Sequence, residues 1–161
     1  MIYRNFYSII VAMIFVLASQ FSTAASPNTE QVIKTYMQAW NNHKPDEAAS
    51  YFADNVEFLD SSVGTPQIGR EAARDNVIKV FIQAVPDLNW RMIGEPIVSG
   101  ENIAFEWEFS GKNTGAWSPE TPATNRPLTF KGVSFIRLKD GKIVTQHDYY
   151  DALGFNKQLG W

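Results

Sequence analysis

The sequence predicts one α+β domain in which three N-terminal helices pack on a mostly antiparallel β-sheet. Apolar residues repeat at helical spacing before Pro86, and long β-prone runs joined by short turns follow it. Helices first and hairpins later are typical of α+β proteins rather than of alternating βαβ units. Residues 26–161 contain no repeat or composition change that would indicate a second domain.

The three helices are expected before residue 86. The first covers residues 28–40, where Tyr36 and Trp40 belong to one apolar face. Turn-forming residues then separate it from a short second helix that ends near Asp54. The third helix covers residues 70–85 and ends because a proline follows, which disfavours a helical conformation in the preceding residue.

The sheet is expected from one short strand and two hairpins. Residues 56–60 form the short strand, residues 90–98 pair with 103–109, and residues 128–138 pair with 143–150. The second hairpin turns at an Asp-Gly pair between apolar runs, which is a strong hairpin signal.

Alternation in residues 103–109 predicts that one face of the sheet is buried. Ile103, Phe105, Trp107 and Phe109 fall on one side of this strand and two glutamates on the other. These side chains either fill a plain core or leave an aromatic pocket. If a pocket exists, the candidate substrate-binding residues are Tyr36, Trp40, Phe58, Trp107, Trp117 and Phe130. Residues 111–127 are a candidate lid over it, or a passive surface connection.

The last strand carries the candidate catalytic residues Asp151, His147 and Tyr149. Period two places them on one side of the strand and Asp148 with Tyr150 on the other. We prefer the His147 side, because the apolar residues 152–155 could then fold over a buried Asp151. A carboxyl group among aromatic side chains has a raised pKa, which suits acid or base catalysis. Burial of Asp148 would move the role to that residue, and a solvated strand would have no catalytic role.

Several functional classes are disfavoured by composition and motifs. Seventeen acidic residues against fourteen lysines and arginines argue against nucleic-acid binding. The absence of cysteine excludes disulfides and thiolate chemistry. Only His43 and His147 are present, so we expect no metal site, and no phosphate-binding or serine-hydrolase motif appears. We therefore expect no cofactor.

Residues 1–25 have the layout of a secretory signal peptide. Arg4 precedes an apolar run of residues 9–18, and small residues lead to a cleavage site after Ala25 or Ala24. The apolar run is shorter than the roughly 20 residues that span a bilayer, so an uncleaved anchor is the weaker alternative. We expect a secreted or periplasmic domain, residues 26–161, without stable membrane association after cleavage.

Four segments together carry a family resemblance: residues 84–88 (AVPDL), 132–135 (GVSF), 140–154 (DGKIVTQHDYYDALG) and 157–160 (KQLG). Through them the chain resembles the SnoaL-like polyketide cyclases, which belong to the nuclear transport factor two-like superfamily. The resemblance covers about residues 28–160. It implies a cone-shaped fold with a pocket between helices and curved sheet, and a homodimer packed through the sheet. It also implies that Asp151 is the acid/base of a ring-closing aldol reaction.

The function expected from these observations is that of a secreted, cofactor-free lyase, isomerase or cyclase. Its substrate would be a small hydrophobic carbonyl or hydroxy compound, with Asp151 as acid/base. Two alternatives remain open on the sequence: a non-catalytic module that binds a small hydrophobic ligand, and an interaction protein that uses the sheet surface.

Overall fold

The computed structural model describes residues 28–161, so the expected signal peptide and its cleavage site lie outside the described residues. In chain order the elements are α1 (Thr29–Asn41), α2 (Pro45–Ala49), β1 (Phe52–Asp60), β2 (Gln67–Ile68), α3 (Arg70–Ala73), the π-helical turn η1 (Arg74–Ile78), α4 (Lys79–Ala84), β3 (Asn89–Ser99), β4 (Asn102–Lys112), β5 (Pro127–Lys139), β6 (Lys142–Tyr150) and α5 (Ala152–Leu159). This arrangement confirms the predicted α+β class.

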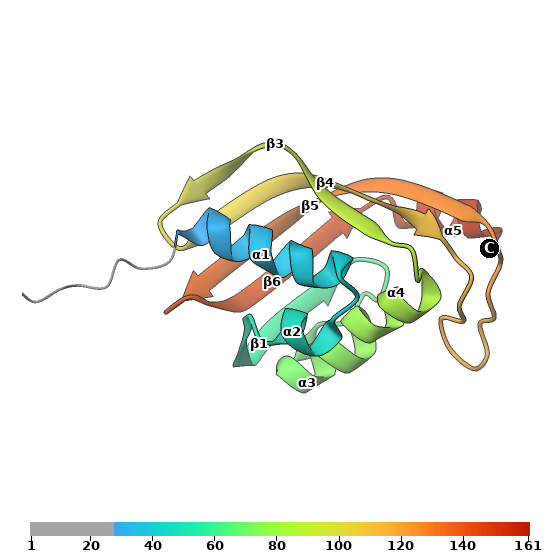
Figure 1. Cartoon of the computed structure of the whole chain (residues 1–161), viewed down its shortest axis with the longest axis horizontal. Helices are drawn as coiled ribbons and strands as arrows, with labels where there is room; N and C mark the ends of the chain where they lie inside the picture. Colours follow the sequence, from blue (N-terminus) through green and yellow to red (C-terminus); the bar gives the residue numbers. More distant parts are fainter. Residues whose placement is uncertain (1–27) are drawn as a thin grey trace, which may run out of the picture.

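The N-terminal helices lie on one face of the sheet (Figure 1). The N-cap of α1 is Asn28, whose side chain accepts a hydrogen bond from the backbone N–H of Glu30. The segments α3, η1 and α4 follow one another directly and end before Pro86, as predicted. The predicted second helix is too long, because α2 ends at Ala49 and Phe52 already belongs to β1, where it pairs with β6.

Within the described part of the chain, six strands form one sheet in the order β2-β1-β6-β5-β4-β3. The two predicted hairpins are β3–β4 and β5–β6, and both are antiparallel. Strand β1 pairs in parallel with β6, so the first and last long strands lie side by side in the middle of the sheet. This pairing brings distant parts of the sequence together next to the helices.

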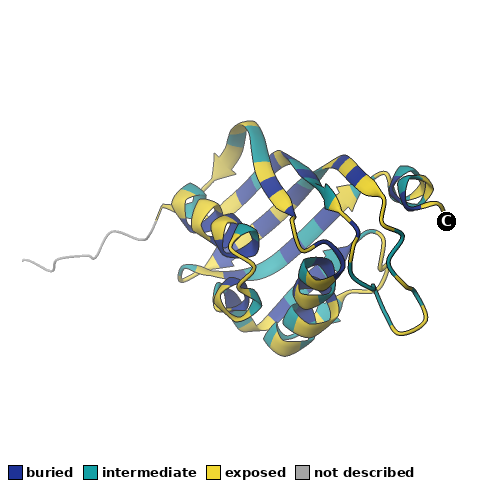
Figure 2. Ribbon diagram, turned by 45° about the vertical axis from the view of Figure 1, so that its right-hand side comes forward, coloured by how far each residue is buried: buried dark blue, intermediate teal, exposed yellow. Residues whose placement is uncertain are grey.

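Strand β4 shows how the core forms. Ile103, Phe105, Trp107 and Phe109 are buried, as their alternation predicted, and the residues between them point to the other face. On that outer face Glu108 forms an ion pair with Arg91 of β3 at 2.7 Å. Buried positions therefore concentrate on the sheet face that the helices cover (Figure 2).

Among residues 28–161, no helix has the length and apolar character needed to span a bilayer.

Candidate functional site

Asp148 of β6 is a buried carboxylate on the helix-facing side of the sheet, with 7% of its surface exposed. Its Oδ1 accepts a hydrogen bond from Ser134 Oγ of β5 at 2.6 Å, and its Oδ2 accepts one from Gln146 Nε2 at 2.9 Å. Ser134 Oγ in turn accepts from Trp107 Nε1 of β4 at 2.8 Å. Side chains of three adjacent strands thus fix the orientation of this carboxylate.

Gly132 of β5 makes room for Trp107. A Cβ atom at this position would collide with the six-membered ring of Trp107 and lie 2.7 Å from the backbone oxygen of Tyr149. Because glycine has no side chain, the indole can lie close to the backbone of β5 and reach Ser134 with its N–H. The glycine is therefore part of the structure that supports Asp148.

The pKa of Asp148 is raised to about 7. Burial is the main cause and the negative charge of Asp60 adds to it, while the hydrogen bonds from Ser134 and Gln146 act in the opposite direction. Burial also raises the pKa of Tyr36, with the charge of Asp148 as a smaller cause. Near neutral pH the Asp148 side chain is therefore present in both its protonated and its ionised form, as an acid/base catalyst requires.

Asp60 is a second buried carboxylate, at the end of β1, with 5% of its surface exposed. Its Oδ1 accepts hydrogen bonds from Tyr150 OH at 2.8 Å and from the backbone N–H and Oγ of Ser62 at 2.8 and 2.6 Å. Burial, and next the charge of Asp60, raise the pKa of Tyr150, so its hydroxyl group stays protonated as the donor. The site thus holds two carboxylates whose hydrogen-bond partners are neutral.

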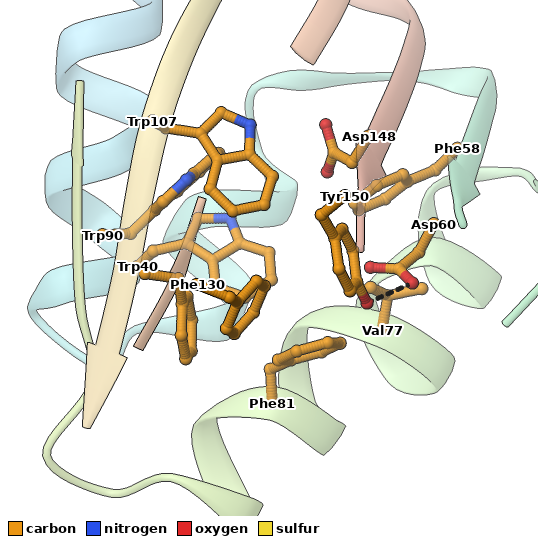
Figure 3. Close-up of a pocket in the computed structure, with 11 residues that line it drawn as sticks. Trp40, Phe58, Asp60, Val77, Phe81, Trp90, Trp107, Phe130, Asp148 and Tyr150 are labelled. Atoms are coloured by element: carbon orange, nitrogen blue, oxygen red, sulfur yellow. Dashed lines mark hydrogen bonds between the residues drawn. The ribbon is translucent and has the colours of Figure 1, made fainter. Parts of the chain in front are cut away.

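Both carboxylates border a cavity between the helices and the sheet (Figure 3). The residues that line it are Trp40, Phe58, Asp60, Val77, Phe81, Trp90, Trp107, Phe109, Phe130, Asp148 and Tyr150. The cavity is small, with a volume of about 30 Å³. A cavity this narrow suits a small molecule, and a polycyclic one would require side chains to move.

Four of the predicted substrate-binding residues line this cavity: Trp40, Phe58, Trp107 and Phe130. Tyr36 is fully buried next to it, with its ring against Trp40 and Trp90, but it is not a lining residue. Trp117 also lies outside the lining and packs against Phe81 at a ring distance of 5.1 Å. Their role in binding remains a prediction.

The predicted orientation of the last strand is wrong. Asp151 is exposed and follows β6 as the N-cap of α5, where its Oδ1 accepts a hydrogen bond from the backbone N–H of Gly154 at 2.9 Å. Tyr149 is 46% exposed on the outer face. His147 lies on that face too, where its Nε2 contacts Glu57 Oε1 at 2.9 Å. The side of this strand that faces the helices carries Ile143, Gln146, Asp148 and Tyr150 instead.

Two local features explain this orientation. The β5–β6 register shifts between the pairs Arg137–Thr145 and Leu138–Ile143, so one extra residue of β6 lies between Ile143 and Thr145. Ile143 is buried, and the extra residue moves the inward positions from odd to even numbers. The apolar segment after the strand, residues 152–155, is also only partly buried. In α5 the side chain of Phe155 is buried, whereas Leu153 is 64% exposed.

Asp60 is the site residue that was missed on the sequence alone. Phe58 and Asp60 have the same parity in β1, so a strand that points Phe58 inward also points Asp60 inward. That signal was available in the predicted strand of residues 56–60. Phe81 of α4 and Trp90 of β3 also line the cavity and are not among the predicted substrate-binding residues.

Some buried polar atoms near the cavity have no hydrogen-bond partner in the described structure. They are Tyr36 OH, Trp40 Nε1 and Gln146 Oε1, and a fourth is Trp117 Nε1. Buried polar groups are normally satisfied by protein or water. Trp40 lines the cavity with its ring, and its side-chain N–H lies beside the buried hydroxyl group of Tyr36.

The candidate lid, residues 111–127, is tied to the domain by Asn113. This residue is fully buried, donates hydrogen bonds to the backbone oxygens of Ala84 and Gly115, and accepts from the backbone N–H and Oγ1 of Thr124. Trp117, on the same loop, packs against Phe81 of the cavity lining. The loop therefore covers a side chain of the cavity from outside.

Among residues 28–161, no group of three or more histidine, cysteine, aspartate or glutamate side chains is placed to hold a metal ion. A buried carboxyl group beside a cavity can act in proton transfer.

Solved structures of the same fold come from several bacteria. TsrD from Streptomyces laurentii has 22% identity and a TM-score of 0.68, covering 81% of this chain and 93% of its own. A SnoaL-like polyketide cyclase from Shewanella putrefaciens has 15% identity and a TM-score of 0.69, covering 94% and 98%. A protein with a ketosteroid isomerase-like fold from Catenulispora acidiphila, in complex with trimethylamine, has 18% identity and a TM-score of 0.68, covering 83% and 95%.

A search of curated proteins gives no significant match. The family model described as SnoaL-like polyketide cyclase matches residues 30–159, which is nearly the whole described structure. The inward aspartate, the aromatic cavity and the helix-covered curved sheet lie within these residues. The chain therefore belongs to the SnoaL-like polyketide cyclase family.

Proposed function

We propose that this protein is a cofactor-free enzyme of the lyase, isomerase or cyclase type that uses Asp148 as acid/base on a small hydrophobic carbonyl or hydroxy compound. The observation that carries the proposal is a buried carboxyl group with a pKa of about 7, held by hydrogen bonds at the edge of an aromatic cavity. General acid–base catalysis is most effective when the pKa of the catalyst is close to the working pH.

The proposed reaction begins with proton transfer from carbon. Ionised Asp148 removes a proton from the carbon next to a carbonyl group. The electron pair of the broken C–H bond forms a carbon–carbon double bond, and the π electron pair of the carbonyl group moves to its oxygen, which gives an enolate. Protonated Asp148 then returns the proton to the same or another carbon, or to an oxygen formed in ring closure.

This proposal moves the acid/base role from Asp151 to Asp148. Asp151 is exposed, and its carboxylate is engaged in capping α5. His147 and Tyr149 lie on the opposite face of the sheet from the cavity. None of the three side chains lines the cavity.

A hydrogen–deuterium exchange assay tests the proposal without knowledge of the natural substrate. A panel of small ketones and dicarbonyl compounds is incubated in D₂O with the protein, and loss of the acidic C–H signal is followed by proton NMR. We expect the wild-type protein to accelerate exchange for at least one compound, with a pH profile that changes near 7. Asp148→Asn should lower the enzymatic rate by about 100-fold or more.

The matched control is Asp151→Asn, which replaces the same functional group outside the cavity and keeps a good helix cap. The Asp151→Asn variant should accelerate exchange in the test compounds at the wild-type rate. If Asp148→Asn retains the rate, or if only Asp151→Asn loses it, the assignment to Asp148 is wrong.

The second candidate function is ligand binding without chemistry. The related fold from Catenulispora acidiphila is described in complex with trimethylamine, so a protein of this fold can hold a small organic molecule. A binding module needs the same cavity, but it needs no acid/base group whose ionisation controls a reaction rate. Saturable binding without accelerated exchange in the panel would favour this function.

The homodimer expected from the family resemblance remains a proposal. Its support is the apolar character of the outer sheet face, where Ile97, Phe135 and Tyr149 are among the exposed large side chains. Phe135 and Tyr149 contact each other at a ring distance of 6.2 Å, across the β5–β6 pair. Light scattering should give twice the mass of the chain, and Phe135→Lys should reduce it to the monomer mass.

Export also remains a proposal and rests on residues 1–25. N-terminal sequencing of the protein recovered outside the cytoplasm should begin at Ser26 or one residue earlier, and a start at Met1 would contradict cleavage.

A further inference from the structure

The charges that border the cavity all have the same sign. Asp60 and Asp148 are lining residues, and within residues 28–161 the lining contains no lysine, arginine or histidine. Neither carboxylate takes part in an ion pair of the described structure. Their hydrogen-bond donors are hydroxyl, amide and backbone groups, which carry no net charge. When these carboxyl groups are ionised, no cationic side chain of the described residues compensates their charge.

The rest of the lining is aromatic. Trp90 lies between two other indoles, with ring centroids 5.5 Å from Trp40 and 6.2 Å from Trp107. On the sheet side, Phe130 and Tyr150 are in contact at 4.8 Å. Figure 3 shows the indoles on one side of the cavity and the two carboxylates on the other. Aromatic rings attract cations through their π-electrons, and tryptophan does so most strongly.

We propose that the polar end of the ligand is a small alkylated ammonium group, bound between the indole rings and the carboxylates of Asp60 and Asp148. The methyl groups of such a cation would pack against the apolar rings, and its positive charge would attract the two carboxylates. Aromatic cages that recognise quaternary ammonium groups combine the same two features. This inference deepens the proposed function and rests on it for the location of the site, but it can fail separately.

The alternative occupants fit less well. A fully apolar ligand would match the rings but would remove water from two carboxylates and provide no partner for them, which is costly. An anionic ligand would be repelled by both carboxylates. A large cation would not fit into the narrow space between the rings without moving them. A compact cation of a few carbon atoms matches the charge, and it requires less movement of the lining side chains than a large one.

Calorimetric titration of the full domain with choline and with its uncharged analogue dimethylbutanol, in which carbon replaces nitrogen, tests the inference. The two compounds have nearly the same shape and differ in charge. At pH 8 we expect choline to bind at least tenfold more tightly than dimethylbutanol. Equal affinity for the two compounds, or no binding of choline, would overturn the inference.

The variants Asp60→Asn and Asp148→Asn remove one charge each and retain a hydrogen-bond acceptor. Each should weaken choline binding at least fivefold and leave dimethylbutanol binding within a factor of two, whereas Asp151→Asn should change neither. Choline binding that is unaffected by both cavity substitutions would place the cation elsewhere and contradict the inference. Circular dichroism on each variant confirms that the fold is retained.

The pH dependence of the wild-type protein gives a test without substitution. Choline prefers the ionised form of Asp148, so its affinity should rise as pH increases from 5.5 to 8. The other titratable groups that face Asp148 are Asp60 of β1, Tyr150 of β6 and Tyr36 of α1. Both tyrosines have raised pKa values and stay neutral over this range. A choline affinity that is constant or falls with pH would contradict the inference.

The experiments distinguish failure of the ammonium inference from failure of the proposed catalytic function. If dimethylbutanol binds as tightly as choline while the exchange assay still depends on Asp148, the ammonium inference fails and the proposed function stands. If choline binds as expected but no carbonyl compound shows accelerated exchange, the catalytic proposal fails and the cation site stands.

Discussion

Asp60 and Asp148 are Cα partners in the parallel pairing of β1 and β6. Side chains at partnered positions of adjacent strands point to the same face, and such strands lie about 4.8 Å apart. The two carboxylates consequently share one cavity, and the charge of Asp60 adds to burial in raising the pKa of Asp148. This pairing is the structural origin of the proposed chemistry.

Replacement of Asp148 should change how stability depends on pH. In the unfolded chain an aspartate ionises near pH 4, roughly, whereas folded Asp148 keeps its proton until about pH 7. The preference of the folded protein for protonated Asp148 therefore adds to the free energy of unfolding. This contribution is fully present below about pH 4 and is lost as pH rises through 7. Asp148→Asn should be more stable relative to wild type at pH 8 than at pH 5. Urea denaturation at the two pH values measures this, with Asp151→Asn as control; an unchanged difference would mean that Asp148 ionises normally.

Gly132→Ala should destabilise the domain by about 1 to 3 kcal/mol, because the new methyl group would overpack the space that Trp107 occupies. The displaced indole should also lose its hydrogen bond to Ser134. Urea denaturation measures the loss of stability, and tryptophan fluorescence reports the changed environment. Lys131→Ala, at an exposed position of the same strand, is the control and should have little effect. Equal stability of the two variants would show that the indole can move without cost.

Asp151→Ala should lower the free energy of unfolding by about 1 kcal/mol, because α5 loses the side chain that caps its N-terminus. Asp151→Asn should retain most of this stability, since asparagine is also a good N-cap. Both variants should catalyse exchange and bind ligand as the wild type does. A loss of activity with unchanged stability would indicate a chemical role for Asp151.

Asn113→Ala should release the loop of residues 111–127. The substitution removes two accepted and two donated hydrogen bonds of a buried side chain, so we expect destabilisation of at least about 2 kcal/mol. The amide of Thr124 should exchange faster in hydrogen–deuterium exchange mass spectrometry, while the β4–β5 amides stay protected. Glu120→Ala, in an exposed part of the same loop, is the control. Unchanged exchange at Thr124 would show that other contacts hold the loop.

Local sequence patterns predict the class of fold and much of the cavity lining. Apolar periodicity identified α1 and the helical run of residues 70–84, and the alternation in β4 identified Trp107 and Phe109 as inward residues. These features are local, because a helix or a strand repeats its own pattern over a few residues. The resemblance of the C-terminal segment identified the family and the strand that carries the candidate acid/base.

Which aspartate enters the cavity depends on how the strands pair. The extra residue of β6 between Ile143 and Thr145 becomes visible through the register with β5, and it changes the side to which Asp148 points. The second carboxylate, Asp60, reaches the same cavity through the parallel pairing of two strands that are distant in the sequence. Strand parity is set by each strand's pairing partner, and the pKa of a buried group is set by everything that surrounds it, so neither follows from the local sequence.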